Sequence, residues 1–376
     1  MSSAAATVCL NARDLLARRA AETPGIISFA GGLPDPALFP KRQLAQAFVA
    51  ALQSDGTAAL QYGWPEGSLE LRRWIAGELN GRGAQVTAER VIITNGAQQG
   101  IQIAVAAVKD RSHIGIEPES YPGALDIFRA AHAQLVSLAD PAGLYYVMPS
   151  VSNPRGSTMS EPDRRALLAR ASGNRGFVIE DDAYQGTSFS GARQRPLLAD
   201  APERVFHVGT FSKTLCPGLR LGWLVPPPRL AKRALRHKQA SDLQANGLTQ
   251  ALVVEYLRTG HFAKLQKRAR AYYRRKLERL LEAVRRDLPQ FRFDEPIGGF
   301  SLWLESDQDA DDTELLEAAV EAGASFDLGR QFRHGRTRNL CVRLCFSAVP
   351  ATDIDAGVAR IARALRRVRP PERRRR

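Results

Sequence analysis

Residues 208–223 read Val-Gly-Thr-Phe-Ser-Lys-Thr-Leu-Cys-Pro-Gly-Leu-Arg-Leu-Gly-Trp, an apolar segment that carries Thr210, Ser212, Lys213 and Arg220. Burial of Lys213 in such a segment disfavours its charged form, so the free amine that attacks a carbonyl becomes accessible near neutral pH. The two hydroxyls and the guanidinium are donors suited to a phosphate group. A lysine beside a phosphate site indicates pyridoxal 5'-phosphate (PLP). On these residues alone, a strand end and turn with an incidental lysine remains the alternative.

The composition is that of an ordinary globular chain, and the length favours about two domains. Of its 376 residues, 44% are hydrophobic, which is enough for sizeable cores. No apolar run approaches the roughly 18 residues that a membrane-spanning helix needs, and the N-terminus lacks the pattern of a signal peptide. We therefore expect a cytoplasmic protein with no membrane partner.

The net charge of +14 raises the question of nucleic-acid binding, but its distribution argues against that function. Much of the charge lies in the tail at 366–376 and in an expected helix at 261–288. Aromatic residues are not interleaved as stacking platforms, and no zinc-finger or RNP pattern is present. A solvated helix face and a disordered tail account for the charge, so we expect no nucleic-acid partner.

The cysteines indicate neither a disulfide framework nor a metal site. Cys9, Cys216, Cys341 and Cys345 are too few and too widely spaced for either, so reduced thiols are expected. Cys341 and Cys345 flank Arg343 at every second position, which would set all three on one face of a strand at 339–346. Packing residues are the usual interpretation of such cysteines, with a reactive pair as the alternative.

Short apolar strands alternate with helices through the first two thirds of the chain. The expected strands are 91–94, 113–118, 145–148, 177–181 and 205–209. The expected helices are 10–21, 68–79, 100–108, 122–133 and one that Ser160 caps. Polar residues follow each strand, a pattern typical of a doubly wound α/β sheet that binds its ligands at the carboxyl ends of the strands.

Two further segments are candidate ligand sites. Asn95-Gly96-Ala97-Gln98-Gln99 joins a strand to a helix and leaves free N–H groups that suit an anion. The pair Gly31-Gly32 marks a place where the backbone turns sharply or approaches a ligand closely.

After Arg229 the pattern becomes helical, with a long amphipathic helix at 260–288. The remainder, with segment 298–304, a helix near 313–322 and the strand around Arg343, indicates a smaller α+β domain.

In this order, the segments from about Ile26 to Val349 resemble the PLP-dependent aminotransferases of the aspartate aminotransferase fold. The likeness is greatest to the 2-aminoadipate and kynurenine aminotransferases and to the aminotransferase-like half of MocR regulators. The resemblance implies an α/β fold, with a large doubly wound mixed sheet that binds PLP and a smaller α+β domain built from the C-terminal part and the N-terminal arm. The implied divisions are an arm and substrate loop at 1–40, the large domain at 41–260, the small domain at 261–366 and a basic tail at 367–376.

The resemblance also implies roles for residues around the cofactor ring. Lys213 matches the lysine of the internal aldimine, which later carries the proton between Cα and C4'. Asp181 matches the carboxylate paired with the pyridine nitrogen, which lets the ring accept electrons. Tyr184 and Asn153 match the groups that hydrogen-bond the phenolic oxygen, and Tyr121 matches the aromatic stacked on the ring.

The same comparison places the phosphate and the substrate. The implied phosphate-binding residues are Gly96, Ala97, Gln98, Thr210, Ser212, Arg220 and, from a second subunit, Tyr62. Arg343 matches the arginine that binds the substrate α-carboxylate in bidentate fashion, beside Asn153, and Gly31 and Gly32 match the loop over the substrate. Structural roles are the alternatives: a cap or surface pair for Asp181, packing for Tyr121 and Tyr62, and a plain turn for the two glycines.

Three positions depart from the usual family pattern. Ala97 stands where a hydroxyl is common, Thr210 where Ser is common, and Ser152 where Gln is common. The first two lose or move one phosphate donor without removing the site. The third is compatible with a different substrate.

The expected function is that of a homodimeric aminotransferase with shared active sites. It would transfer an amino group from an L-amino acid to PLP and then to a 2-oxo acid in a ping-pong mechanism. A second hypothesis keeps PLP but changes the outcome to that of a β-lyase, a cyclase or an oxidase. A third is a MocR-type regulator without its DNA-binding domain. Regulators of this type carry a winged-helix domain ahead of the aminotransferase-like part, and only about 25 residues precede Ile26 here, which disfavours this hypothesis. The substrate side chain is left open.

Overall fold

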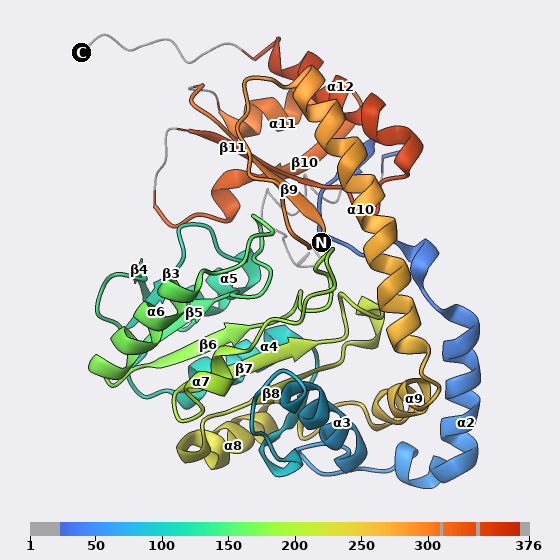
Figure 1. Ribbon diagram of the computed structural model, residues 1–376, viewed down its shortest axis with the longest axis vertical. Helices are drawn as coiled ribbons and strands as arrows, with labels where there is room; N and C mark the ends of the chain where they lie inside the picture. Colours follow the sequence, from blue (N-terminus) through green and yellow to red (C-terminus); the bar gives the residue numbers. More distant parts are fainter. Residues whose placement is uncertain (1–22, 309–310, 336–338, 369–376) are drawn as a thin grey trace, which may run out of the picture.

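A seven-stranded sheet forms the centre of the larger part of the molecule in the computed structural model, which describes residues 23–308, 311–335 and 339–368 (Figure 1). The strand order is β2-β8-β7-β6-β5-β3-β4. The strands are β2 (Ile92–Thr94), β3 (His113–Ile116), β4 (Gln134–Ser137), β5 (Leu144–Val147), β6 (Phe177–Asp181), β7 (Val205–Thr210) and β8 (Gly222–Val225). Strand β8 runs antiparallel to β2 and β7, whereas the other neighbours are parallel. The sheet is therefore mixed.

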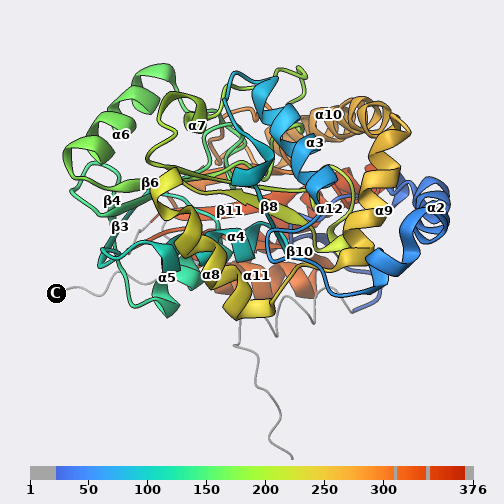
Figure 2. The same ribbon diagram turned by 90° about the horizontal axis from the view of Figure 1, so that it is seen from below.

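Helices cover both faces of this sheet, which explains why its strands are apolar throughout. One face carries α3 (Leu69–Asn80), α6 (Glu161–Gly173) and α7 (Leu197–Asp200), as Figure 2 shows. The other carries α4 (Ala97–Ala107), α5 (Pro122–Ala130) and α8 (Ala231–Asp242). Along β6, Phe177 and Ile179 belong to the core on the side of α4 and α5, while Val178 belongs to the core on the side of α3 and α6. Alternate side chains thus fill two separate cores.

A four-stranded sheet forms the smaller part, in the order β1-β10-β11-β9. Its strands are β1 (Ile27–Phe29), β9 (Ser301–Ser306), β10 (Ala324–Leu328) and β11 (Leu340–Cys345). The helices α11 (Asp312–Glu321) and α12 (Ile354–Leu365) pack on it, and the long α10 (His261–Asp287) lies alongside α12. Because β1 pairs with β10, the N-terminal segment joins the C-terminal sheet. The predicted fold class is confirmed, whereas the division of the chain into four segments stays a prediction.

Two more helices pack together at the side of the larger part, α2 (Lys41–Leu60) and α9 (Gly247–Arg258) (Figure 1). The sequence analysis did not assign α2, α12, β1, β4 or β10. Three of these are strands of at most five residues, too short for a periodic pattern to stand out. The predicted helix at 10–21, Cys9 and the tail from residue 369 lie outside the described residues. The three described cysteines are free thiols, as predicted.

The backbones of β7, β8 and the start of α4 approach closely at Gly222. A Cβ atom at this position would lie 2.6 Å from the Gly209 carbonyl oxygen, 2.8 Å from the Gly96 carbonyl carbon and 3.0 Å from the Ala97 nitrogen. Backbone atoms of a packed sheet and helix cannot move aside as a flexible side chain can. The absence of a side chain at Gly222 therefore sets the distance between the strand and the helix start.

We expect Gly222→Ala to lower the free energy of unfolding by about 1–3 kcal/mol, because the added methyl overpacks this contact. Urea unfolding followed by circular dichroism measures the change. The matched control is Gly173→Ala near the end of α6, where a Cβ atom would meet nothing within 4 Å. The control should leave stability unchanged or raise it by about 0.5 kcal/mol. Equal effects of the two substitutions would contradict the packing argument.

Candidate active site

A cavity of about 410 Å³ lies where the carboxyl ends of β6 and β7 face the smaller sheet. Its lining contains most of the residues that the sequence singled out, namely Gly31, Ala97, Gln98, Tyr121, Asn153, Asp181, Tyr184, Thr210, Ser212, Lys213, Arg220 and Arg343. Gly32 and Gly96 contact lining residues. Tyr62 lies elsewhere, 78% exposed on the surface. The structure therefore brings together all the predicted site residues except Tyr62.

Lys213 follows β7 directly and points into the cavity. Its Nζ atom donates a hydrogen bond to the Gly32 carbonyl oxygen at 3.0 Å and lies 5.4 Å from the centre of the Tyr184 ring. Burial, with the nearby positive charge of Arg343, lowers the pKa of Lys213 to about 8. Near neutral pH, a larger fraction of this amine is therefore uncharged, and nucleophilic, than of an ordinary lysine.

Asp181 ends β6 and is almost fully buried at the floor of the cavity. Its carboxylate accepts hydrogen bonds from the Tyr146 hydroxyl at 2.8 Å and from the Ala183 N–H at 3.1 Å. Burial raises the pKa of Asp181 to about 6, although these two hydrogen bonds favour the charged form. The carboxylate is thus fixed in orientation. Sequence reasoning missed Tyr146, although its place on the same face of the adjacent strand β5 was a usable signal.

Gly96 is the N-cap of α4, in the turn where the sequence predicts an anion site. Its φ of 84° lies in the region that favours glycine, and a Cβ atom there would lie 2.8 Å from Nη2 of Arg220. The first N–H groups of α4, at Ala97 and Gln98, have no partner within the helix. Backbone donors at a helix start and a guanidinium thus converge on one side of the cavity.

The turn after β7 is organised by Thr210. Its hydroxyl oxygen accepts a hydrogen bond from the Ser212 N–H at 3.1 Å and lies 2.9 Å from both the Ser212 hydroxyl and the Leu221 carbonyl oxygen. Thr210 therefore holds the turn that presents Ser212 and Lys213.

Ser152, the third position that departs from the family pattern, is hydrogen-bonded to Ser157 and does not line the cavity.

Arg343 extends from β11 across the cavity from Lys213. Its Nη1 donates to Asn153 Oδ1 at 2.7 Å, and its Nε and Nη2 donate to Asp327 Oδ2 at 3.0 and 2.6 Å. Burial disfavours the charged guanidinium, but the Asp327 carboxylate more than offsets this and raises the pKa of Arg343. Sequence reasoning missed Asp327, because β10 was not recognised and the cross-strand pair of Asp327 with Arg343 could not be formed.

The Gly31-Gly32 loop closes the cavity from the N-terminal side. The Gly31 N–H donates to the Asp327 carboxylate at 3.1 Å. Both glycines have positive φ values, and a Cβ atom on Gly32 would lie 3.5 Å from Arg343 Nη2 and 3.6 Å from the Tyr184 hydroxyl. Glycine at position 32 therefore leaves room between the arginine and the tyrosine.

Burial raises the pKa values of Tyr184 and Tyr121, so both phenols are protonated at neutral pH.

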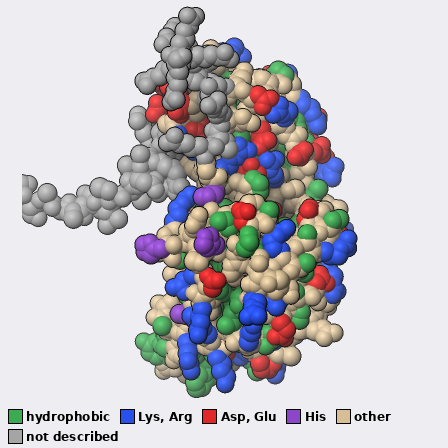
Figure 3. Space-filling view, turned by 90° about the vertical axis from the view of Figure 1, so that its left-hand side faces the viewer, with side chains coloured by type: hydrophobic (Ala, Val, Ile, Leu, Met, Phe, Trp, Pro, Cys, Tyr) green, Lys and Arg blue, Asp and Glu red, His purple; other side chains and the backbone are tan. Residues whose placement is uncertain are grey.

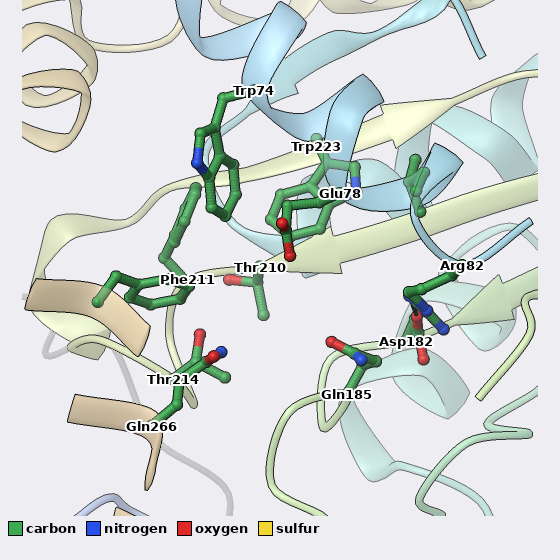
Figure 4. Close-up of a pocket in the computed structure, with 12 residues that line it drawn as sticks. Trp74, Glu78, Arg82, Asp182, Gln185, Thr210, Phe211, Thr214, Trp223 and Gln266 are labelled. Carbon is green, nitrogen blue, oxygen red and sulfur yellow. Dashed lines mark hydrogen bonds and ion pairs between the residues drawn. The ribbon is translucent and has the colours of Figure 1, made fainter. Parts of the chain in front are cut away.

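A buried charge network lies behind Asp181, on the opposite face of β6. Asp182 forms an ion pair with Arg82 at 2.6 Å, and His207 Nδ1 lies 3.0 Å from Glu180. Figure 4 shows Arg82 and Asp182 side by side in a small cavity that Trp74 and Trp223 also line. Burial disfavours the charge on Asp182, but Arg82 and His207 more than offset this and lower its pKa. The strand alternation thus directs Asp181 into the candidate site and its two neighbours into this network.

Four charged side chains join the larger and smaller parts at the edge of the site. Arg155 and Arg333 each pair with both Glu119 and Glu305, at distances of 2.6 to 2.8 Å. Glu119 and Arg155 follow strands of the larger sheet, whereas Glu305 and Arg333 belong to the smaller part. This ring fixes the two parts against each other beside the cavity.

Three sequence predictions concern what the molecule lacks. Within residues 23–308, 311–335 and 339–368, no group of three or more His, Cys, Asp or Glu side chains is placed to hold a metal ion. In the same part of the chain, no helix combines the length and apolarity that crossing a membrane requires. On the face that Figure 3 shows, Lys and Arg side chains are interspersed with Asp and Glu. The absence of a nucleic-acid partner stays a prediction.

Known proteins are similar to this chain in sequence and in architecture. The profile of the family described as aminotransferase class I and II matches residues 34–361. A 2-aminoadipate transaminase of Thermus thermophilus is 34% identical over 379 residues, which cover 94% of this chain and 93% of that protein. The structure of kynurenine aminotransferase from Pyrococcus horikoshii, in complex with PMP, has a TM-score of 0.89 at 28% identity and covers 97% of this chain and 96% of its own.

Transcriptional regulators are also among the similar proteins. The HTH-type regulator TauR of Rhodobacter capsulatus is 34% identical over 302 residues, which cover 76% of this chain and 62% of the regulator. The transaminases, in contrast, match over nearly their full length. Because the family match spans most of the chain, including Lys213, Asp181 and Arg343, the protein belongs to the class I and II aminotransferase family of enzymes, as the sequence predicted.

Proposed function

We propose that the protein is a PLP-dependent aminotransferase that moves the α-amino group between an L-amino acid and a 2-oxo acid in a ping-pong mechanism. The observation that carries this proposal is the convergence of Lys213, Asp181 and Arg343 on one cavity from β7, β6 and β11. The transaminase from Thermus and the PMP complex of the Pyrococcus enzyme support it.

The residues of the cavity fit PLP. The glycine at Gly96 leaves the space beside Arg220 free, and the helix start provides N–H donors for a phosphate group. Asp181 offers an oriented carboxylate to the pyridine nitrogen, and Tyr121 lines the wall where a ring would stack. When bound, PLP supplies an aldehyde for the amino group and a ring that accepts electrons from Cα.

Lys213 has two tasks in this proposal. Its amine would hold the cofactor through the aldehyde group, and the lowered pKa keeps more of that amine uncharged than in an ordinary lysine. With substrate bound, the Lys213 amine would act as the general base that takes the proton from the substrate Cα and as the acid that returns it. The hydrogen bond from Nζ to Gly32 holds the amine in the cavity before substrate arrives.

Asp181, Asn153, Tyr184 and Arg343 position the reactants. Asp181 stabilises the proton on the pyridine nitrogen, and its hydrogen bonds from Tyr146 and Ala183 keep its orientation. The Tyr184 hydroxyl and the Asn153 amide would donate hydrogen bonds to the phenolic oxygen of the cofactor. Arg343 binds the α-carboxylate and so fixes the direction in which Cα presents its proton.

Two alternatives remain within the proposal. A β-lyase, cyclase or oxidase would use the same residues around the ring, and a lyase releases ammonia without any 2-oxo acid. The similarity to TauR supports a regulatory function as a second candidate. Product analysis with and without 2-oxo acid distinguishes an aminotransferase from a lyase, cyclase or oxidase. Sequence-selective DNA binding at physiological salt would identify a regulator.

We further propose that two copies pair through an exposed apolar surface. The exposed side chains on α2 and in the segment that follows it are Phe48, Val49, Leu52, Leu60, Tyr62, Trp64 and Leu69. Exposed large apolar side chains that gather in one stretch of the chain favour an interaction site there. In the dimer, Tyr62 would reach the phosphate in the active site of the second copy, which accounts for its exposed position in one chain.

We expect Lys213→Ala to abolish the absorbance of lysine-bound PLP and to slow the half-reaction with an amino acid by about 10³-fold or more, because the proton carrier is lost. Stopped-flow spectroscopy of the purified protein measures both quantities. The control Lys267→Ala, on the exposed face of α10, should behave as wild type. Full half-reaction activity in Lys213→Ala would disprove the proposed mechanism.

The lowered pKa of Lys213 predicts how pH controls cofactor binding. Only the uncharged amine attacks the aldehyde, so the rate at which PLP joins the cofactor-free protein should rise with pH through about 8 and then level off. Nα-acetyl-lysine, whose side-chain amine has a pKa of about 10.4, is the comparison, and its rate of reaction with PLP should still rise with pH above about 8. A protein profile that coincides with that of Nα-acetyl-lysine would show that the amine is not perturbed.

Hybrid dimers test the role of Tyr62. Lys213→Ala and Tyr62→Ala should each be nearly inactive at limiting PLP, but random pairing of equal amounts should restore about one quarter of wild-type activity. The reason is that about half of the dimers are then mixed, and each mixed dimer has one site with both native residues. No recovery on mixing would show that Tyr62 does not act across a subunit boundary.

A further inference from the structure

Asp327 is an acidic group within the candidate substrate site that the family resemblance did not assign. Its side chain and that of Arg343 are 14% and 7% exposed, and both line the cavity. One oxygen of Asp327, Oδ2, accepts from both Nε and Nη2 of Arg343. The same carboxylate accepts from the Gly31 N–H, so it holds the substrate loop and the arginine together.

The pair leaves a defined set of donors on Arg343. A guanidinium has five N–H groups. Asp327 takes the Nε group and one on Nη2, and Asn153 takes one on Nη1. One N–H on each terminal nitrogen remains, which matches the two oxygens of a single carboxylate. Arg343 can therefore still bind an α-carboxylate while Asp327 stays in place.

Each of the three cations that line the cavity already has a partner in the proposed function. The charged lining residues are Asp181, Lys213, Arg220, Asp327 and Arg343. In the proposed function, Lys213 and Arg220 serve the cofactor, and Asp181 serves its ring nitrogen. Asp327 neutralises Arg343. Among the lining residues within the described part of the chain, a second carboxylate on the substrate would find no free positive charge and would approach the negative charge of Asp327.

The rest of the substrate side of the cavity is apolar or uncharged. Leu33, Met148, Phe332 and Pro122 line it, together with the amide of Gln331. The Phe332 ring lies 4.4 Å from the guanidinium carbon of Arg343 and so covers the pair on one side. A side chain that leaves Cα in this direction meets carbon atoms rather than charged groups, which favours an uncharged substrate.

We propose that Asp327 is a specificity-determining residue that makes the site select amino acids and 2-oxo acids with one carboxylate and an uncharged side chain over dicarboxylic ones. This inference rests on the proposed function, because it assumes that Arg343 binds the substrate carboxylate. It deepens that function by naming a substrate class. Asp327 acts through the charge that it contributes beside Arg343 and through the donors that it occupies.

Binding of two carboxylates that lack an amine tests the inference without turnover. Calorimetry on the PLP-loaded protein should give a Kd for glutarate at least about tenfold higher than that for 4-methylpentanoate. In Asp327→Asn, which keeps an oxygen acceptor and removes the charge, that ratio should fall by about fivefold or more. The matched control Asp307→Asn removes an equal charge from an exposed ion pair with Arg292 and should leave the ratio unchanged.

The half-reactions with leucine and glutamate provide the second measurement. Wild type should favour leucine in kcat/KM by about tenfold or more, and Asp327→Asn should reduce that preference. A purely structural role for Asp327 would weaken both ligands equally, leave both ratios unchanged and overturn the inference. A wild-type protein that binds glutarate as tightly as 4-methylpentanoate would overturn it even if the variant failed to fold.

The two proposals fail in distinguishable ways. If no amino acid is converted but the ratio of the two dissociation constants behaves as expected, the aminotransferase proposal fails and the assignment of Asp327 stands. If leucine and glutamate are both converted but glutamate is preferred, the assignment of Asp327 fails and the aminotransferase proposal stands.

Discussion

The burial of charged groups between the two sheets is the constraint on which the site depends. A buried ionisable group either has its pKa shifted toward the uncharged form or gains an oppositely charged partner. Lys213 and Asp181 show the first response, with pKa values displaced to about 8 and about 6. Arg343 cannot lose its proton in this range, and Asp327 supplies the partner. Burial thus moves the pKa values of Lys213 and Asp181 toward neutral pH, while Arg343 stays charged.

The same constraint shapes the surroundings of the site. Behind β6, Asp182 is paired with Arg82, so that one strand presents a perturbed carboxylate on one face and a paired one on the other. At the edge of the cavity, the ring of Glu119, Arg155, Glu305 and Arg333 connects the two parts of the molecule. These pairs hold the smaller sheet, and Arg343 with it, over the cavity that Lys213 and Asp181 line.

Much of the fold and of the site could be predicted because the informative residues follow apolar strands or sit in glycine turns. The stretch around Lys213, the turn at Gly96 and the position of Asp181 at the end of a strand indicated a ligand site on local grounds alone. The three-residue strand β1 and the five-residue strand β10 gave no such pattern, since they are short and depend on strands far away in the chain: β1 pairs with β10, and β10 pairs with β1 and β11. Asp327 on β10 was consequently missed.

The sequence by itself determined the alternation of strands and helices, the family and the identity of the lysine, because these depend on local pattern and on the order of motifs. The tertiary structure alone decided which charges meet. Asp327 and Arg343 are adjacent only through the register of β10 against β11, and Tyr146 reaches Asp181 only because β5 lies beside β6. The reason is physical: pKa values and substrate charge preference depend on distances of a few ångströms between residues that are far apart in the chain.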